Sequence, residues 1–191
     1  IGGLPYGGSD VSDFSGVIRY VRVEYSGGAA DGQSENNGFS FYGVGNGTTV
    51  DHSQAFDGKD DGIEFFGGTV NASYLSVVNA QDDSVDWTEG WSGAITNTYV
   101  VLNRDDFSTA IEADGDNANP TITDFTAVSE TGGIALQFKK ESGATITGLS
   151  LQGFDTSFDY RDGGAVSNVQ VEGEDSNPAL SYVATATVDI A

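Results

Sequence analysis

The chain of 191 residues has no cysteine, only three prolines and only seven basic residues. Disulfide bonds therefore contribute nothing to its stability, although an extracellular location stays open because a repetitive fold with a continuous core does not need them. The scarcity of proline fits a structure that keeps its strand-to-strand hydrogen bonds. The length indicates a single domain, residues 1–191, that is large enough to bury a sizeable core.

The shortage of basic residues leaves the chain strongly acidic. Seven Lys and Arg stand against 29 Asp and Glu, which gives a formal net charge of −22 at pH 7. Nucleic acids are bound by clustered Lys and Arg, so we expect no nucleic-acid partner. Anionic membrane surfaces are disfavoured for the same reason, whereas cations and neutral or cation-bridged polymers are favoured.

Long hydrophobic runs are absent as well. No apolar stretch approaches the roughly 20 residues that span a bilayer, so we expect no membrane insertion. No signal peptide is recognisable, and the chain starts at Ile1 rather than at a methionine. We therefore interpret residues 1–191 as a fragment or the mature part of a longer chain.

What the sequence does contain is a recurring alternation of apolar and polar residues. At spacings of roughly 22 to 26 residues it repeats a triplet whose outer positions are apolar and whose middle position is polar: Phe39-Ser40-Phe41, Ile63-Glu64-Phe65, Val85-Asp86-Trp87, Ile111-Glu112-Ala113, Leu136-Gln137-Phe138 and Phe158-Asp159-Tyr160. Alternation at period two is typical of a half-buried strand. Its recurrence at a fixed longer period indicates a solenoid, in which equivalent residues of successive coils stack in columns.

A second apolar pattern follows each triplet. It has the form Ile-x-x-Val-x-Val and occurs at Ile18–Val23, Ile122–Ala127, Ile146–Leu151 and Val166–Val171, with looser copies that start at Val50, Val70 and Ile95. Glycine-rich runs separate the two strands of each coil, and the 27 glycines fit a structure made of many corners. No stretch has a sustained helical period. Because crossovers between parallel strands are nearly always right-handed, we predict an all-β, right-handed parallel β-helix of about seven or eight coils.

This layout resembles the pectin-lyase-like superfamily. Residues 15–27 and 60–83, SGVIRYVRVEYSG and DDGIEFFGGTVNASYLSVVNAQDD, are also similar in style to secreted or lipoprotein β-helices of Gram-negative bacteria. The resemblance implies the β-helix fold and a bacterial location that is secreted or on the outer cell surface, and it implies no settled activity. The segment from Leu180 to Ile190 still alternates like a strand, and neither end has a clear cap. We therefore expect further coils or end-to-end self-association.

Paired aspartates directly precede three of the triplets. The pairs Asp60-Asp61, Asp82-Asp83 and Asp105-Asp106 recur at spacings of 22 and 23 residues, so they are expected to stack about 4.8 Å apart. Stacked carboxylates repel one another unless cations or protons intervene. Three interpretations stay open: a solvated acidic corner that hydrogen-bonds turn backbone, a Ca²⁺ site that uses all six aspartates, and a catalytic site.

The catalytic alternative would be a polysaccharide hydrolase or lyase. Asp82, Asp83, Asp105 or Asp106 would supply the general acid and base. The resemblance to polygalacturonase-like members, which stack aspartates at a comparable corner, implies a basic motif on later coils, where Lys139 and Arg161 lie. It also implies a histidine in that region, whereas the single histidine, His52, precedes the first aspartate pair. We therefore favour no catalytic residue.

The outward positions of the first strand form a candidate binding groove. Glu64, Asp86 and Glu112 occupy its middle, and Lys139 and Arg161 lie toward its C-terminal end. An elongated polar groove suits a polysaccharide or cell-surface glycan, although a solvent face with surface ion pairs explains the same pattern. As aromatic platforms for a sugar we expect Trp91, which is out of phase with the core residues, and then Phe66 and Tyr42. Trp91 could instead fold back over the coil edge.

The sequence as a whole favours an extracellular or cell-surface structural and adhesive module. We expect it to be stabilised by Ca²⁺, to bind glycans and to be non-catalytic. A polysaccharide-degrading enzyme that uses the stacked aspartates is the alternative.

Overall fold

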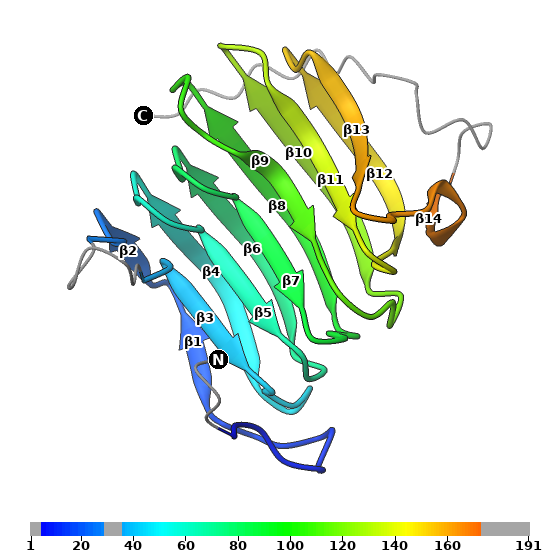
Figure 1. Ribbon diagram of the computed structural model, residues 1–191. Helices are drawn as coiled ribbons and strands as arrows, with labels where there is room; N and C mark the ends of the chain where they lie inside the picture. Colours follow the sequence, from blue (N-terminus) through cyan, green and yellow to red (C-terminus); the bar gives the residue numbers. More distant parts are fainter. Residues whose placement is uncertain (1–4, 29–35, 173–191) are drawn as a thin grey trace.

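In the computed structural model, which describes residues 5–28 and 36–172, the strands form two parallel sheets that face each other (Figure 1). The long-strand sheet contains β1 (Val17–Arg19), β2 (Arg22–Glu24), β4 (Thr49–Phe56), β6 (Asn71–Val78), β8 (Ala94–Leu102), β10 (Thr121–Ser129), β12 (Ala144–Gln152) and β14 (Val169–Glu172). The short-strand sheet contains β3 (Phe39–Tyr42), β5 (Ile63–Phe66), β7 (Val85–Thr88), β9 (Thr109–Ala113), β11 (Ile134–Lys139) and β13 (Thr156–Arg161).

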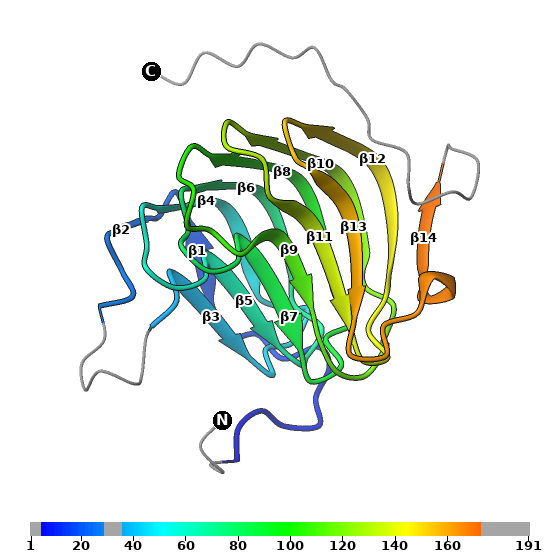
Figure 2. The ribbon, with the colours of Figure 1, turned by 45° about the horizontal axis from the view of Figure 1, so that its top comes forward.

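The chain alternates between the two sheets and so winds as a solenoid, as Figure 2 shows from a second direction. The six strands of the short-strand sheet give about six turns for the described residues, slightly fewer than the seven or eight predicted for the whole chain. The single helical element among the described residues is the 3₁₀ turn η1 (Val166–Asn168), which agrees with the absence of a helical period. The strand expected between Leu180 and Ile190 lies outside the described residues.

The predicted triplets are confirmed as the strands of the short-strand sheet. In the observed register the first triplet residues oppose one another from coil to coil: Phe39, Ile63, Val85, Ile111, Leu136 and Phe158. The outer positions of the triplets fill the interior, where Phe65, Ile111 and Phe138 have no exposed surface. Residues of adjacent coils also stack, as in the pair Phe41 and Phe65, whose ring centroids lie 5.3 Å apart.

Each long strand bends at one residue that has a left-handed backbone. These residues form a column along the long-strand sheet, with φ between 48° and 69°: Tyr20, His52, Tyr74, Asn97, Asp124 and Gly148. The bend explains the Ile-x-x-Val spacing, because the chain turns between the two apolar residues. A left-handed backbone is unfavourable for most side chains, but rings contact one another at the first three of these positions. The ring centroid of His52 lies 4.8 Å from that of Tyr20 and 4.6 Å from that of Tyr74.

Candidate functional site

Three carboxylates from two adjacent coils converge on the short-strand sheet. Glu64 lies in the middle of β5 and pairs in register with Asp86 of β7, while Asp61 lies two residues before β5. One oxygen of each residue lies within 4.8 Å of the others. All three are buried, with exposed fractions of 6% for Asp61, 9% for Glu64 and 7% for Asp86. We call Asp61, Glu64 and Asp86 the carboxylate cluster.

Few hydrogen-bond donors compensate the charge of this cluster. Asp61 Oδ1 accepts a hydrogen bond from the backbone N–H of Asp83 at 3.0 Å, and Glu64 Oε2 accepts one from the amide of Asn37. Asp86 Oδ1 is buried and has no hydrogen-bond partner among the described residues. A buried carboxylate oxygen without a partner is costly. The cluster therefore requires either protons or a cation.

The pKa shifts in the cluster have the same cause. Burial raises the pKa of Asp61 to about 9, and the nearby charge of Asp83 adds to the effect. Burial, followed by the charges of Asp61 and Glu64, raises the pKa of Asp86 well above its usual range. Burial also raises the pKa of Glu64, although the hydrogen bond from Asn37 acts to lower it. Without a cation, Asp61 and Asp86 therefore favour their protonated forms at neutral pH.

Asp83 lies next to the cluster and is only 3% exposed. Its Oδ1 accepts a hydrogen bond from Thr109 Oγ1 at 2.6 Å. Burial raises the pKa of Asp83 to about 7, and the charge of Glu112 contributes in the same direction. Asp83 therefore changes its protonation state near neutral pH.

Lys139 ends the acidic column on its C-terminal side. Its ammonium donates a hydrogen bond to Glu112, with side chains 26% and 13% exposed. Burial lowers the pKa of Lys139, but the hydrogen bond and charge of Glu112 outweigh it and the pKa is raised. Arg161 pairs in a similar way with Asp159 in β13. Both basic residues are thus paired with acidic neighbours in the folded chain.

The predicted stack of three aspartate pairs is correct for the first two pairs and wrong for the third. The register places Val85 opposite Ile111, and the N–H of Ser108 donates to the carbonyl of Asp82, so Asp82 and Asp83 align with Ser108 and Thr109. The cause is a longer corner, because Val85 and Ile111 are 26 residues apart whereas Ile63 and Val85 are 22 apart. Asp105 and Asp106 lie exposed in that corner.

The first residues of the two stacked pairs lie at the surface. Asp60 is half-buried and Asp82 is exposed. Together with Asp61 they form a second group of carboxylates whose oxygens lie within 4.8 Å of one another.

Asp106 accepts a hydrogen bond from Arg104 at 2.5 Å, and Arg104 also donates to the carbonyl oxygen of Asn79 at 3.1 Å. Arg104 therefore ties the corner of its coil to the preceding one.

The expectation that Trp91 is an exposed aromatic platform is wrong. Trp91 has no exposed surface, its ring stacks on Phe65 with centroids 4.4 Å apart, and Nε1–H donates to the carbonyl of Val70 at 3.1 Å. Trp91 folds back into the core, as its alternative interpretation allowed. Phe66 is 9% exposed and stacks on Tyr42, also at 4.4 Å. Tyr42, 41% exposed, is the accessible one of the three.

Two features of the site were not visible in the sequence. Glu64 and Asp86 were expected on the floor of an open groove, but the structure buries both and brings Asp61 beside them. The phase of the triplets shows that their middle residues face outward. It does not show how far neighbouring side chains such as Asn37 cover them.

Comparison with known proteins gives one match. A family described as a pectate-lyase like beta helix domain matches residues 1–187. This match supports the right-handed parallel β-helix. No curated protein and no solved structure matches the chain. Among the described residues, no helix is long and apolar enough to cross a membrane.

Proposed function

The chain belongs to the pectate-lyase like beta helix domain family, and from that premise we propose that it is a non-catalytic module of a secreted or cell-surface protein, stabilised by Ca²⁺. The carboxylate cluster is the proposed site of the ion. The observation that carries the proposal is the buried Oδ1 of Asp86, which has no hydrogen-bond partner among the described residues and lies among other carboxylates.

The geometry of the cluster fits a hard cation. Ca²⁺ binds oxygen ligands at about 2.3 to 2.6 Å, so two ligands of the same ion lie at most about 5.2 Å apart. The oxygens of Asp61, Glu64 and Asp86 lie within 4.8 Å of one another and meet this condition. Carboxylates from successive coils can provide the charge that the ion needs, and waters and carbonyls can complete its coordination.

The electrostatics of the cluster favour the same ion. The raised pKa values of Asp61 and Asp86 show that this site opposes the charged form of each group. A divalent cation reverses this preference, so its binding displaces protons from the cluster. Glu112, paired with Lys139, is already neutralised and is not needed as a ligand.

In this role the ion connects adjacent coils. Asp61 and Glu64 belong to one coil and Asp86 to the next, so the bound ion would join two turns of a rod that lacks disulfide bonds. An ion that binds the folded state and not the unfolded one raises stability by about 2.7 kcal/mol when its concentration is 100 times the Kd. Further coils or copies stacking on the outer strands would extend the rod.

A glycan partner is the second part of the proposal. Lys139 and Arg161 lie on the short-strand sheet, and Tyr42 of the same sheet provides an exposed ring. Acidic polysaccharides are the favoured class, because a cation held by the surface carboxylates Asp60 and Asp82 can bridge to their carboxylates. Retention of the protein on immobilised acidic polysaccharide in Ca²⁺, and its release by a chelator, would support this part.

The experiment for the stabilising role is thermal unfolding at neutral pH in Ca²⁺ and in a chelator. We expect a higher Tm in Ca²⁺, and equal Tm values in both solutions would contradict the proposal. Ionic-strength effects are controlled by matching the salt concentration with NaCl, because screening alone changes the stability of an acidic protein.

A polysaccharide-cleaving enzyme is the second candidate, and one observation favours it. The pKa of Asp83, about 7, suits a group that exchanges protons at neutral pH. Asp83 is only 3% exposed, however, and its Oδ1 is engaged by Thr109, which argues against contact with a polymer. The test is incubation with acidic and neutral polysaccharides, with new reducing ends and unsaturated products as the readout. Cleavage that Asp83→Asn abolishes would establish the enzyme.

A further inference from the structure

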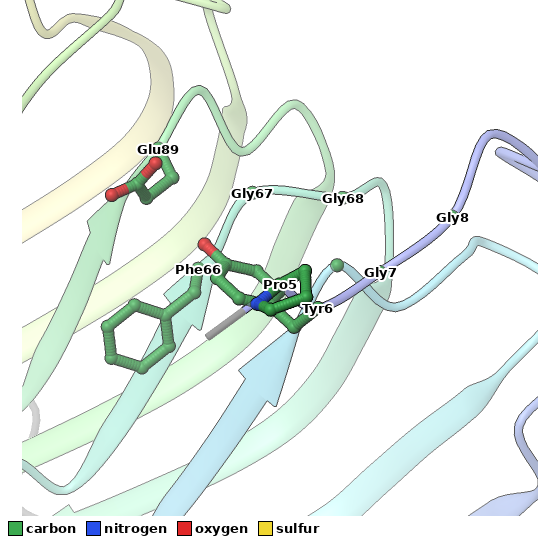
Figure 3. Close-up of a pocket in the computed structure, with 9 residues that line it drawn as sticks. Pro5, Tyr6, Gly7, Gly8, Phe66, Gly67, Gly68 and Glu89 are labelled. Atoms are coloured by element: carbon green, nitrogen blue, oxygen red, sulfur yellow. The ribbon is translucent and has the colours of Figure 1, made fainter. Parts of the chain in front are cut away.

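A hollow of about 400 Å³ lies where the N-terminal segment crosses the corner that follows the short strands (Figure 3). It is lined by Pro5, Tyr6, Gly7, Gly8, Gly43, Phe66, Gly67, Gly68 and Glu89. Five of these nine residues are glycines, so the floor is mostly backbone and the side chains of Pro5, Tyr6, Phe66 and Glu89 define its chemistry. The carboxylate cluster described above does not contribute to its lining.

A close backbone contact fixes the N-terminal segment at the hollow. A Cβ atom added to Gly43 would lie 2.7 Å from the Cα of Gly7, and both glycines have left-handed φ values of 61° and 74°. Only glycine allows this approach without displacement of the backbone. The contact holds the adjacent Tyr6 ring over the corner.

Aromatic rings form one side of the hollow. Tyr6 packs edge-on against Tyr42, with centroids 5.5 Å apart and an angle of 69° between the ring planes. Tyr42 in turn stacks on Phe66 at 4.4 Å. Of the two rings that line the hollow, that of Tyr6, which is 37% exposed, is more accessible than that of Phe66, which is 9% exposed.

Glu89 supplies the negative charge on the other side. Among the described residues that line the hollow, Glu89 has the only charged side chain, and it is exposed. Figure 3 shows Tyr6, Phe66 and Glu89 around the same space. Burial raises the pKa of Tyr6, and the charge of Glu89 raises it further, so the negative field of Glu89 reaches the hydroxyl group of Tyr6.

The combination of an exposed aromatic ring and one carboxylate favours some classes of ligand over others. An anion is excluded by Glu89 and by the net charge of −22. One carboxylate is too few for a calcium ion, which takes six to eight oxygens. A sugar needs several hydrogen-bonding side chains, whereas the lining offers Glu89 and the Tyr6 hydroxyl. An aromatic ring beside a carboxylate is the environment that organic cations prefer, because the negative ring face and the carboxylate both attract them.

We propose that the hollow formed by Tyr6, Phe66 and Glu89 binds a small organic ammonium ion, such as a quaternary ammonium group. The ring of Tyr6 contacts the methyl groups of the ion, and Glu89 neutralises its charge. The site is separate from the carboxylate cluster, so its occupation does not depend on Ca²⁺.

The test is a titration of the ¹³C,¹⁵N-labelled protein with tetramethylammonium chloride and with choline, followed by NMR. We expect saturable shifts of the aromatic resonances of Tyr6, Tyr42 and Phe66 and of the backbone amides of Gly67 and Gly68. The neutral isostere of choline, 3,3-dimethylbutan-1-ol, should bind more weakly. NaCl at the same ionic strength should produce no saturable shifts at these residues.

Two substitutions separate the contributions of ring and charge. Both Tyr6→Leu and Glu89→Gln are expected to weaken binding, each by roughly two- to fivefold, the range for an exposed cation–π contact or ion pair. Glu130→Gln makes the same charge change at an exposed position that does not line the hollow and should leave binding unchanged. Backbone spectra outside the hollow show whether each variant keeps its fold.

Three results would overturn the proposal. They are no saturable shift with either ammonium ion, equal binding of choline and its neutral isostere, and shifts at these residues caused by a neutral sugar but not by ammonium ions. Asp86→Asn provides an independent check, because it removes a proposed calcium ligand and should leave ammonium binding intact. Loss of calcium-dependent stability with retained ammonium binding would therefore not affect this inference.

Discussion

Glu64 of β5 and Asp86 of β7 are direct partners in a parallel sheet, and both are more than nine-tenths buried. Two acidic residues that face each other across adjacent coils repel when both are charged. Their register therefore makes a proton or a cation part of the folded structure. Asp61, within 4.8 Å of both, increases this requirement.

Asp86→Asn is expected to abolish most of the stabilisation by Ca²⁺ with little change in the stability of the metal-free protein. The amide has the shape of the protonated carboxyl group that burial favours at this position. A loss of about 2 kcal/mol or more of calcium-dependent stability is expected at saturating Ca²⁺. Urea unfolding in Ca²⁺ and in chelator measures both quantities. Asp105→Asn, at an exposed position outside the column, is the matched control and should respond to Ca²⁺ like the parent protein.

The stability of the metal-free protein should decrease as pH rises through neutrality. Burial raises the pKa of Asp61 to about 9 and that of Asp83 to about 7, from the ordinary value of 3.8. The folded state therefore holds protons that the unfolded state releases, so this contribution is complete below about pH 4 and is lost as pH rises toward 9. Denaturant unfolding in chelator from pH 5 to 9 measures the slope. Stability that rises over this range would contradict the pKa assignments, and Ca²⁺ should reduce the slope.

Lys139→Met is expected to destabilise the fold by about 1 to 3 kcal/mol. The substitution leaves the mostly buried carboxylate of Glu112 without its cation. Adding Glu112→Gln should recover part of the loss, and urea unfolding of the four proteins in the double-mutant cycle measures the coupling. Lys140→Met is the control, because the more exposed pair of Lys140 and Asp114 is worth less. Equal losses for the two lysines would show that Lys139 has no special role.

Trp91→Ala is expected to destabilise the protein by about 3 to 5 kcal/mol, as for other buried tryptophans. Trp91 has no exposed surface and stacks on Phe65, so its removal leaves a cavity in the core. Trp91→Phe should cost less because it keeps most of the stacking. Chemical denaturation measures both. If Trp91→Ala instead retained full stability, the buried position would be wrong and the platform interpretation would return.

The sequence predicted the fold because the period-two triplets mark the buried face of every short strand, and their register is as expected from Phe39 to Phe158. The sequence did not show that Asp105 and Asp106 leave the stack. The corner before Ile111 is longer and carries this pair out of register, although its spacing from the preceding aspartate pair is the one expected for stacking. It could not place Trp91 either, since an aromatic residue in a glycine-rich corner points inward only when a cavity and a carbonyl such as that of Val70 receive it.

The sequence also did not predict that the carboxylate cluster is buried. Outward-facing polar residues of a sheet are normally solvated, and Glu64 and Asp86 have the outward phase. Their burial depends on neighbours that the spacing of the triplets does not identify. One of them is Asn37 of the preceding coil, whose side-chain amide donates a hydrogen bond to Glu64.

The most direct test of the account is isothermal titration of the metal-free protein with CaCl₂ at pH 7 in two buffers of different ionisation enthalpy. We expect saturable binding of Ca²⁺ and an observed enthalpy that differs between the buffers, because the ion displaces protons from Asp61 and Asp86. The Asp86→Asn variant should lose most of this signal. An absence of binding heat in both buffers, with no calcium-dependent change in Tm, would contradict the proposal that a cation stabilises the cluster.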